Sequence, residues 1–295
     1  MPSLAARLLR PSLLLARTGI GSVTDYSRVR AIFDKTQRAF PLPRGMHTEA
    51  ITAAGVPCEW ARREGVDPAR TVLYLHGGGF VLGWYQQHRA MVGHMTMPMQ
   101  AEVLVVDYRL APEHPFPAAL EDCLTAYRWL AERVPPDQIV VMGDSAGGNL
   151  TLTTLLALRD AGDPLPAAGV AISPVCDFEG TSPTFDTVYD ELIPAEAARR
   201  MFAAYQGDAD PHDPHLAPLH ADFSGLPPLL LHASEREMLR GEIELTAARA
   251  EAAGADVTLT VWPDMWHVFH AYVPLLPEAR TAIDAIGAWL ADRGV

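Results

Sequence analysis

Residues 143–148 read Gly-Asp-Ser-Ala-Gly-Gly, and they follow directly on the apolar run from Gln138 to Met142. A serine on a tight turn between a strand and a helix has a strained backbone, and side chains at its flanks would collide with neighbouring elements. Gly143 and Gly147 bracket Ser145 at two-residue spacing. The pattern predicts a nucleophile elbow, but an ordinary glycine-rich turn with a surface serine can have the same sequence. The rest of the chain must therefore decide between the two.

Short apolar runs alternate with longer segments of helical periodicity along most of the chain. The predicted strands are Arg70 to Leu75, Glu102 to Asp107, Gln138 to Met142, Gly169 to Ser173, Leu229 to Ala233 and Val257 to Val261. The predicted helices are Phe116 to Arg133, Ala146 to Asp160, Gly241 to Ala253 and Pro277 to Arg293. Because the strand runs are apolar throughout, we expect both faces of each strand to be covered. The alternation indicates the α/β class, with a central, mostly parallel β-sheet flanked by helices.

Two stretches, residues 1–44 and 177–225, do not fit this alternation. The first is helical in pattern, and the second is long and proline-rich and includes a helical piece from Ala195 to Tyr205. Both exceed ordinary loop lengths, so we expect them to form structure of their own, as a cap over the mouth of the sheet. No internal repeat or low-complexity linker divides the chain. Residues 1–295 are therefore expected to form a single domain with these two cap elements.

The charge and the N-terminal sequence exclude two classes of partner. The formal net charge is −13, with 36 acidic residues against 23 basic ones, whereas nucleic-acid binding needs clustered lysine and arginine. Between Met1 and Gly21 the longest apolar run is Leu13 to Ala16. That run is too short for a membrane span, so we expect no stable membrane insertion. An amphipathic helix that covers an apolar surface fits the alternation of arginines and leucines better.

Cysteine and histidine usage gives no sign of a disulfide framework or a metal site. The cysteines are odd in number, far apart and without ligand spacing, at Cys58, Cys123 and Cys176. We therefore expect reduced thiols and a cytoplasmic protein. Three histidines gather in a loop rich in proline and aspartate but lack helical register, namely His212, His215 and His220. We expect no metal and no cofactor.

A glycine-rich string upstream of the serine supplies hydrogen-bond donors. Acyl transfer through serine needs a base, an acid that orients the base, and N–H donors for the oxyanion. The first predicted strand runs into residues 76–80, which read His-Gly-Gly-Gly-Phe. A phosphate-binding loop would have a lysine here, and none is present. Gly78 and Gly79, together with Ala146 after the serine, are the predicted oxyanion hole.

The base is expected last in chain order, after the acid. Residues 262–270 follow the last predicted strand and contain two histidines. His267 falls soonest after a turn signal, so its side chain can swing over the edge of the sheet, and we predict it to be the base. We expect His270 to be a surface or cap residue. Glu235 and Glu237 compete for the role of the acid, because both follow the strand that ends at residue 233.

Together these strings resemble the hormone-sensitive-lipase-like branch of the α/β-hydrolases, the bacterial ester hydrolases of family IV. The resemblance covers roughly residues 56–290. It rests on four strings, which are residues 76–80, the run from Asp107 to Ala119, residues 143–148 and Ser173-Pro174. The resemblance implies an α/β-hydrolase fold with a helical cap. It also implies a carboxylesterase that uses a catalytic triad and an HGGG oxyanion hole and needs no cofactor.

The resemblance also assigns roles to residues around the serine. In that family the acid lies in a D-P-L-like step, which Glu237-Met238-Leu239 matches with glutamate for aspartate and methionine for proline. Glu237 also lies 30 residues before His267, as the family tends to show. The triad is then Ser145, Glu237 and His267, with Glu235 as the alternative acid. His76 and Asp144 are expected to be structural, and Arg109 to belong to a buried ion-pair network that supports the site.

Aromatic and apolar residues near the motifs or on the cap helix are candidates for the substrate pocket. They are Phe80, Trp84, Tyr85, Phe178, Met201, Phe202, Tyr205 and Val268. A closed aromatic cap favours small to medium acyl chains over long triglycerides. The same residues could serve a lactone hydrolase or an amidase, and the same fold without a working triad could serve as a small-ligand receptor. A homodimer is compatible with this fold, because chain-terminal helices and strands can pair between subunits.

Overall fold

A single eight-stranded sheet forms the centre of the protein in the computed structural model, which describes residues 2–22, 25–36 and 41–295. The strands are β1 (Met46–Ala53), β2 (Val56–Arg63), β3 (Arg70–Leu75), β4 (Ala101–Val106), β5 (Ile139–Asp144), β6 (Ala168–Ile172), β7 (Leu229–Ser234) and β8 (Val257–Trp262). Their spatial order is β1-β2-β4-β3-β5-β6-β7-β8, and β3 to β8 run parallel to one another. The predicted α/β class and the mostly parallel sheet are confirmed.

The first two strands were not predicted from the sequence. β1 and β2 form an antiparallel hairpin, and β2 pairs antiparallel with β4. The exposed residues of β1 give it little apolar alternation, so its pattern is weak. The turn itself carries the usable signal, because Ala54 and Gly55 both have positive φ angles, 48° and 95°. A two-residue hairpin turn favours glycine for this reason.

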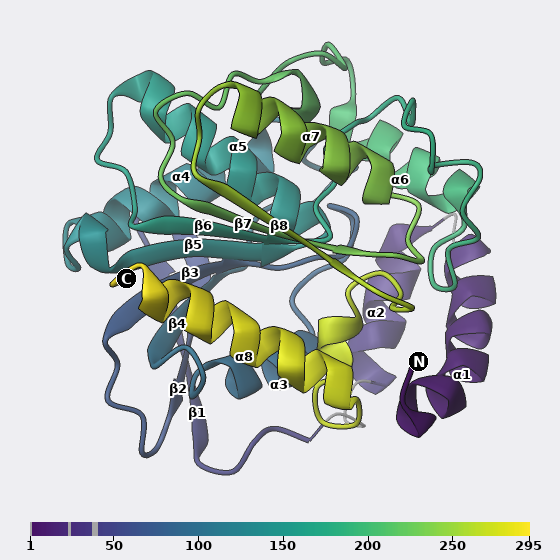
Figure 1. Cartoon of the computed structure of the whole chain (residues 1–295), viewed down its shortest axis with the longest axis horizontal. Coiled ribbons are helices and arrows are strands. Elements are labelled where there is room, and N and C mark those ends of the chain that lie inside the picture. The colour runs from purple at the N-terminus through teal and green to yellow at the C-terminus, as the bar shows by residue number, and fades with distance from the viewer. Residues whose placement is uncertain (1, 23–24, 37–40) are drawn as a thin grey trace.

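Helices cover both faces of the sheet (Figure 1). The helices are α1 (Leu4–Gly21), α2 (Tyr26–Thr36), α3 (Gln86–Met95), α4 (Ala118–Ala131), α5 (Ala146–Ala161), α6 (Ala195–Gln206), α7 (Arg240–Ala252) and α8 (Pro277–Asp292). Short 3-10 turns are η2 (Pro136–Gln138), η3 (Pro218–His220) and η4 (Phe269–Tyr272). α3 and α8 lie on one face and α4, α5 and α7 on the other. The four helices predicted between the strands are present, and α3 was missed.

Alternate residues of the central strands enter two separate cores. In β3, Leu73 and Leu75 pack into the core shared with α4, α5 and α7, whereas Val72 and Tyr74 pack into the core shared with α3 and α8. This alternation explains the apolar runs, since both faces of β3 are buried. The same expectation is wrong for β8, whose residues are only partly buried. β8 lies at the edge of the sheet and pairs with β7 on one side.

α1, α2 and α6 lie together at one end of the molecule (Figure 1). α1 buries Ala6 and Leu13 on one side, as the predicted amphipathic helix requires. Arg30 fastens α2 to the loops after β3 and β4, because its guanidinium donates to the carbonyls of Val81 and Ala111 at 2.7 and 2.6 Å. Among the helices that the structure describes, none has the length and hydropathy of a membrane span.

Candidate active site

Ser145 lies at the sharp turn between β5 and α5. Its backbone has φ 54° and ψ −117°, a strained conformation for a residue with a side chain. Its N–H donates to the carbonyl of Ile172 at 2.8 Å, which fixes the turn against β6. A Cβ at Gly147 would overlap the backbone oxygen of Leu75, and a Cβ at Gly143 would overlap that of Gly147. The two glycines are therefore required by the close approach of neighbouring backbone, as the sequence predicts.

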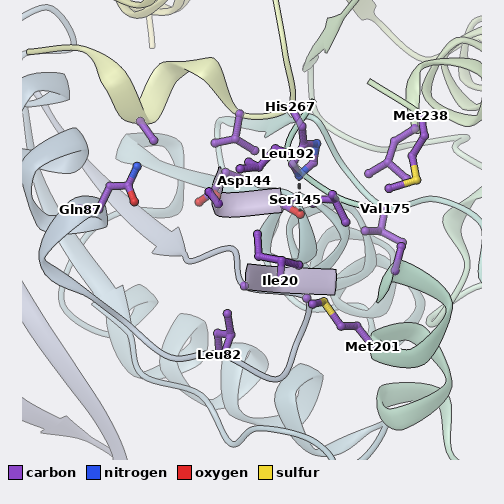
Figure 2. A pocket seen from close by; sticks show the side chains of 18 of the residues that line it. Ile20, Leu82, Gln87, Asp144, Ser145, Val175, Leu192, Met201, Met238 and His267 are labelled. Carbon is purple, nitrogen blue, oxygen red and sulfur yellow. Dashed lines mark hydrogen bonds between the residues drawn. The ribbon is translucent and has the colours of Figure 1, made fainter. Parts of the chain in front are cut away.

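Three predicted residues from distant parts of the chain meet at this turn. The Nε2 atom of His267 lies 2.9 Å from the hydroxyl oxygen of Ser145, and Figure 2 shows the two side chains pointing toward each other. The Nδ1 atom of His267 lies 2.7 Å from the Oε2 atom of Glu237. The other carboxylate oxygen of Glu237 accepts the backbone N–H of Ser234 at 2.7 Å. All three side chains are buried, so water competes little for these hydrogen bonds.

The structure places the two candidate acids in different surroundings. Glu237 is fully buried against His267. Glu235 is exposed, and its carboxylate accepts the backbone N–H of Asp264 at 2.7 Å. Glu235 thus holds the turn that precedes His267, while Glu237 contacts the imidazole itself. Geometry favours Glu237 for the orienting role.

The pKa of His267 reflects two opposing effects. Burial lowers the pKa of His267, since a buried imidazolium loses its hydration. The hydrogen bond and the charge of Glu237 raise it, with smaller contributions from Asp190 and Asp144. The net pKa of His267 lies above its ordinary value of 6.5. The surroundings of His267 therefore favour a proton on this imidazole.

His270 is not the surface or cap residue that we expected. It is fully buried in η4, and its Nε2 atom lies 3.1 Å from the Nδ1 atom of His232 on β7. Burial and the neighbouring His232 and His267 hold the pKa of His270 well below 6.5. The prediction was wrong because the chain turns inward after His267, where Val268 has a left-handed backbone with φ 48°. His270 is a neutral core residue.

The glycine string after β3 borders the serine. Gly78 and Gly79 have φ angles of 130° and 61°, which favour glycine, and both residues line the same cavity as Ser145. Ala146 is buried at the first position of α5, next to Ser145. The N–H groups of all three residues donate no hydrogen bond to another residue within the described part of the chain. The positive end of the α5 dipole adds to the potential at this point.

His76 and Asp144 support the loop, as predicted. The His76 ring stacks on Tyr108 with a centroid distance of 4.2 Å, and burial lowers the pKa of His76 to about 3. The carboxylate of Asp144 accepts the Tyr74 hydroxyl at 2.6 Å and the Gly77 N–H at 3.0 Å. These contacts tie the glycine string to the end of β5. They fix where the backbone donors point.

Arg109 does not belong to the buried network that we expected. Its side chain is 43% exposed and pairs with Glu121, also exposed, and with Asp122. Asp122 accepts both the backbone N–H of Arg109 at 2.8 Å and its guanidinium. The charged group points outward because its partners lie in the first turns of α4. Arg109 therefore fixes the loop before α4 and does not reach the reaction centre.

A cavity of about 230 Å³ opens beside Ser145 (Figure 2). On one side lie polar groups at the ends of strands, including Ser145, His267 and the glycine string. On the other side lie apolar side chains, which include Ile20 of α1 and Met201 and Phe202 of α6. Elements far apart in sequence thus enclose one space. The two predicted cap stretches both contribute to it.

Some of the predicted substrate-binding residues do not line this cavity. Met201, Phe202 and Val268 do. The other five are buried and are not among its lining residues, namely Phe80, Trp84, Tyr85, Phe178 and Tyr205. Phe80 and Tyr205 stack on each other with centroids 3.8 Å apart, and the Trp84 indole donates to Glu59 at 3.1 Å. Proximity to a motif did not fix the direction of these five side chains.

Other lining residues were missed by the sequence analysis. They come from the unpredicted helix α3, the cap segment before α6 and the loop after β7, namely Gln87, His88, Leu192, Ile193, Met238 and Leu239. The last two directly follow Glu237, so the position of the acid could have pointed to them. No local signal marks the other four.

Comparisons with known proteins show the family to which the chain belongs. Residues 72–271 match the family model described as alpha/beta hydrolase fold. The chain belongs to this family. An acetyl-hydrolase of Streptomyces hygroscopicus is 43% identical over 88% of each chain, and the carboxylesterase/phospholipase LipF of Mycobacterium tuberculosis is 37% identical over 84% of this α/β-hydrolase and 70% of LipF.

Solved structures place the α/β-hydrolase in the predicted branch. A crystal structure of an esterase from the bacterial hormone-sensitive lipase family superposes with a TM-score of 0.90 at 39% identity, covering 96% of this chain and 97% of that one. An esterase/lipase from an uncultured bacterium gives 0.92 at 38% identity, covering 99% of each chain. The predicted membership in the hormone-sensitive-lipase-like carboxylesterases is confirmed.

Proposed function

We propose that this carboxylesterase hydrolyses short- to medium-chain acyl esters through a triad of Ser145, His267 and Glu237. One observation carries the proposal, the unbroken pair of hydrogen bonds of 2.9 and 2.7 Å from the Ser145 hydroxyl through His267 to Glu237. This relay opens onto the apolar cavity. A serine next to a base that is itself oriented by a third group is the general form of an activated nucleophile.

The reaction would proceed in two acyl-transfer steps. The Nε2 atom of His267 takes the Ser145 proton while the serine oxygen attacks the ester carbonyl. The N–H groups of Gly78, Gly79 and Ala146 stabilise the oxyanion, and one such donor is typically worth about 3 kcal/mol. The imidazolium then protonates the leaving alcohol. Water, deprotonated by the same imidazole, releases the acid and restores Ser145.

The size of the cavity supports the acyl-chain preference. A volume of about 230 Å³ is small beside the roughly 300–1,000 Å³ of common ligand pockets. The apolar side chains of Ile20, Met201 and Phe202 suit an alkyl chain better than a charged group. The relative from Streptomyces hygroscopicus is called an acetyl-hydrolase, which also points to a short acyl group.

A substrate panel tests the proposal. It compares p-nitrophenyl esters of increasing chain length, lactones and aryl amides on the wild type and on Ser145→Ala. We expect the highest kcat/KM for short and medium esters, and a loss on the order of 10⁶-fold in the variant. Near wild-type turnover by a folded Ser145→Ala protein would overturn the triad. Preference for lactones or amides would replace the substrate class while leaving the triad in place.

Three further features remain proposals. Residues 1–44 and 177–225 would act as the cap of a single domain, since α1 and α6 enclose the cavity. Residues 23–24 and 37–40 of the first stretch lie outside the described residues. A cytoplasmic location is supported by the free thiols of Cys58, Cys123 and Cys176. A homodimer is compatible with the edge position of β8.

A further inference from the structure

A cluster of two imidazoles and a carboxylate lies in the second cap stretch. One ligand atom each from Glu179, His212 and His220 can be chosen so that all three lie within 4.8 Å of one another. None of these residues lines the cavity beside Ser145. We propose that this cluster, called here the cap triad, binds a Zn²⁺ ion that clamps the cap insertion.

Backbone contacts bring the segments of two members of the cap triad, Glu179 and His220, close together. Glu179 lies in a turn that the buried Asp177 organises, because the Asp177 carboxylate accepts the N–H groups of Glu179 and Thr181 at 2.9 and 2.7 Å. His220 ends η3, where the N–H of Leu219 donates to the carbonyl of Cys176 at 3.0 Å. The two segments are therefore held side by side, and a metal would meet a partly formed site.

His212 is oriented in the way that a metal-binding histidine usually is. Its Nε2 atom lies 3.1 Å from the Oε2 atom of Glu179, while its Nδ1 atom lies 3.3 Å from Asp210 Oδ1. A carboxylate on the far ring nitrogen fixes the tautomer and the ring of a metal-bound histidine. Asp210 is in turn fixed by accepting the backbone N–H of His212 at 2.9 Å.

The Nε2 atom of His220 is a free ligand atom for a metal. This atom is shielded from solvent and has no hydrogen-bond partner among the residues that the structure describes. The rings of His212 and His220 meet edge to face, with their centroids 4.6 Å apart. A surface ion pair of His212 with Glu179 and Asp210 would explain three of these side chains. It leaves the buried nitrogen of His220 unexplained, whereas a shared metal satisfies it.

The donor atoms select the class of metal. Two imidazole nitrogens and one carboxylate oxygen suit Zn²⁺ and neighbouring transition metals, while Mg²⁺ and Ca²⁺ prefer oxygen ligands alone. Ligand atoms at Zn²⁺ distances of 2.0–2.1 Å in a tetrahedron lie about 3.3 Å apart. The His212 and Glu179 atoms are already near that separation at 3.1 Å. Rotation of the partly exposed side chains can bring the remaining ligand atoms to this separation, and water would complete the coordination.

The position of the cap triad gives the ion a mechanical role. Glu179 lies before α6 and His212 after it, so a metal joining them closes a loop that contains the whole helix. Closing a loop lowers the entropy of the unfolded chain and so stabilises the folded segment. α6 carries Met201 and Phe202 into the cavity. Bound Zn²⁺ would thus hold one wall of the cavity in place.

The test adds ZnCl₂ to tag-free, full-length protein after removal of metal with EDTA, and it follows binding by calorimetry and unfolding by thermal shift. We expect one Zn²⁺ per chain and a higher Tm, with no such effect of MgCl₂. His212→Ala, His220→Ala and Glu179→Gln should each lose both effects. His215→Ala is the matched control from the same loop, because His215 pairs with Asp160 at 2.9 Å outside the cluster. It should bind Zn²⁺ like the wild type.

Asp210→Asn separates an orienting partner from a ligand. Loss of such a partner typically weakens metal binding roughly 10–100-fold without abolishing it. The proposal is overturned if the wild type shows no one-to-one Zn²⁺ binding, or if His220→Ala binds as tightly as the wild type. A Tm loss in His212→Ala that is the same with EDTA and with ZnCl₂ would reduce the cluster to an ion pair. Ester hydrolysis is not the readout, so the result is independent of the proposed triad.

Discussion

The two walls of the cavity differ in how they are built. The wall that carries Ser145, His267 and the glycine string consists of residues at the ends of β3, β5 and β8, where the backbone fixes each group. The opposite wall consists of apolar side chains from α1 and α6, such as Ile20 and Met201 (Figure 2). The strand-end wall rests on the buried sheet, whereas α1 exposes several leucines to solvent.

This difference predicts that the two walls serve different functions. Catalytic groups must be held within a fraction of an ångström, which the ends of packed strands provide. A wall of apolar helix residues sets the shape of the space and can change without disturbing the chemistry. Substitutions in the strand-end wall should therefore lower turnover of every ester. Substitutions in the helical wall should redistribute activity among esters.

The largest expected effect in this comparison is that of Glu237→Gln. The N–H of Ser234 requires the oxygen of the new amide, so its NH₂ group must face His267. The imidazole would then carry its proton on Nε2 and could not accept one from Ser145. The wrong tautomer costs on the order of 10⁴-fold in kcat in related triads. Steady-state kinetics on a short-chain p-nitrophenyl ester measure this loss.

Glu235→Gln is the matched control. It lies two residues away, is exposed and keeps an oxygen that accepts the N–H of Asp264. We expect its kcat to stay within about twofold of the wild type, as for most surface substitutions. The reverse result, with Glu235→Gln inactive and Glu237→Gln active, would transfer the acid to Glu235. Equal melting temperatures show that both variants fold.

The next effect concerns pH. In the proposed triad His267 acts as a base only when neutral. Its pKa is raised above 6.5, so kcat/KM should rise with pH through a midpoint above 6.5. One unit below that midpoint, activity should be about tenfold lower. The carboxylate of Glu237 raises this pKa, so the imidazole of His267 should titrate at lower pH in Glu237→Gln, as followed by NMR.

His270 provides the internal contrast for the pH experiment. It is as buried as His267 and lies three residues away, but its pKa is held well below 6.5. It faces another neutral imidazole, His232, where His267 faces a carboxylate. We therefore expect kcat/KM to fall on the acid side through a single titration near neutral pH. If the midpoint of this titration is the same in Glu237→Gln as in the wild type, a group other than His267 controls the pH dependence of kcat/KM.

The strand-end wall could be predicted from the sequence, and the helical wall largely could not. Gly143 and Gly147 can be recognised from the sequence, because the close approach of neighbouring backbone excludes any side chain at these positions. This constraint is local in sequence, and it marks Ser145 between them. His267 follows from chain order and from its place after the last strand. The residues alone left Glu235 and Glu237 open, and the family resemblance favoured Glu237. In the structure, the Glu237 carboxylate is buried against His267, whereas the exposed Glu235 accepts the N–H of Asp264.

The helical wall depends on contacts that no short window of sequence contains. Ile20 and Met201 come from helices about 180 residues apart, and their approach is set by long-range packing. Phe80 and Tyr205 were expected to face substrate, but they stack on each other and are not among the lining residues of the cavity. Aromatic residues near a motif are as well suited to supporting a wall as to forming its surface. The neighbourhood of these residues could be predicted from the sequence, but their orientation could not.

The smallest expected effect comes from the helical wall, through Ile20→Ala. Ile20 lines the cavity, so its truncation should admit a longer acyl chain and leave the catalytic groups in place. A pocket change of one or a few methylenes is worth roughly 1–3 kcal/mol of discrimination, so the kcat/KM ratio of hexanoate to butyrate ester should rise about tenfold. Leu15→Ala on the same helix is the control, because Leu15 is 77% exposed and lies outside the cavity. An equal loss of activity on both esters in Ile20→Ala would mean that α1 also positions the reaction centre, and the division between the two walls would fail.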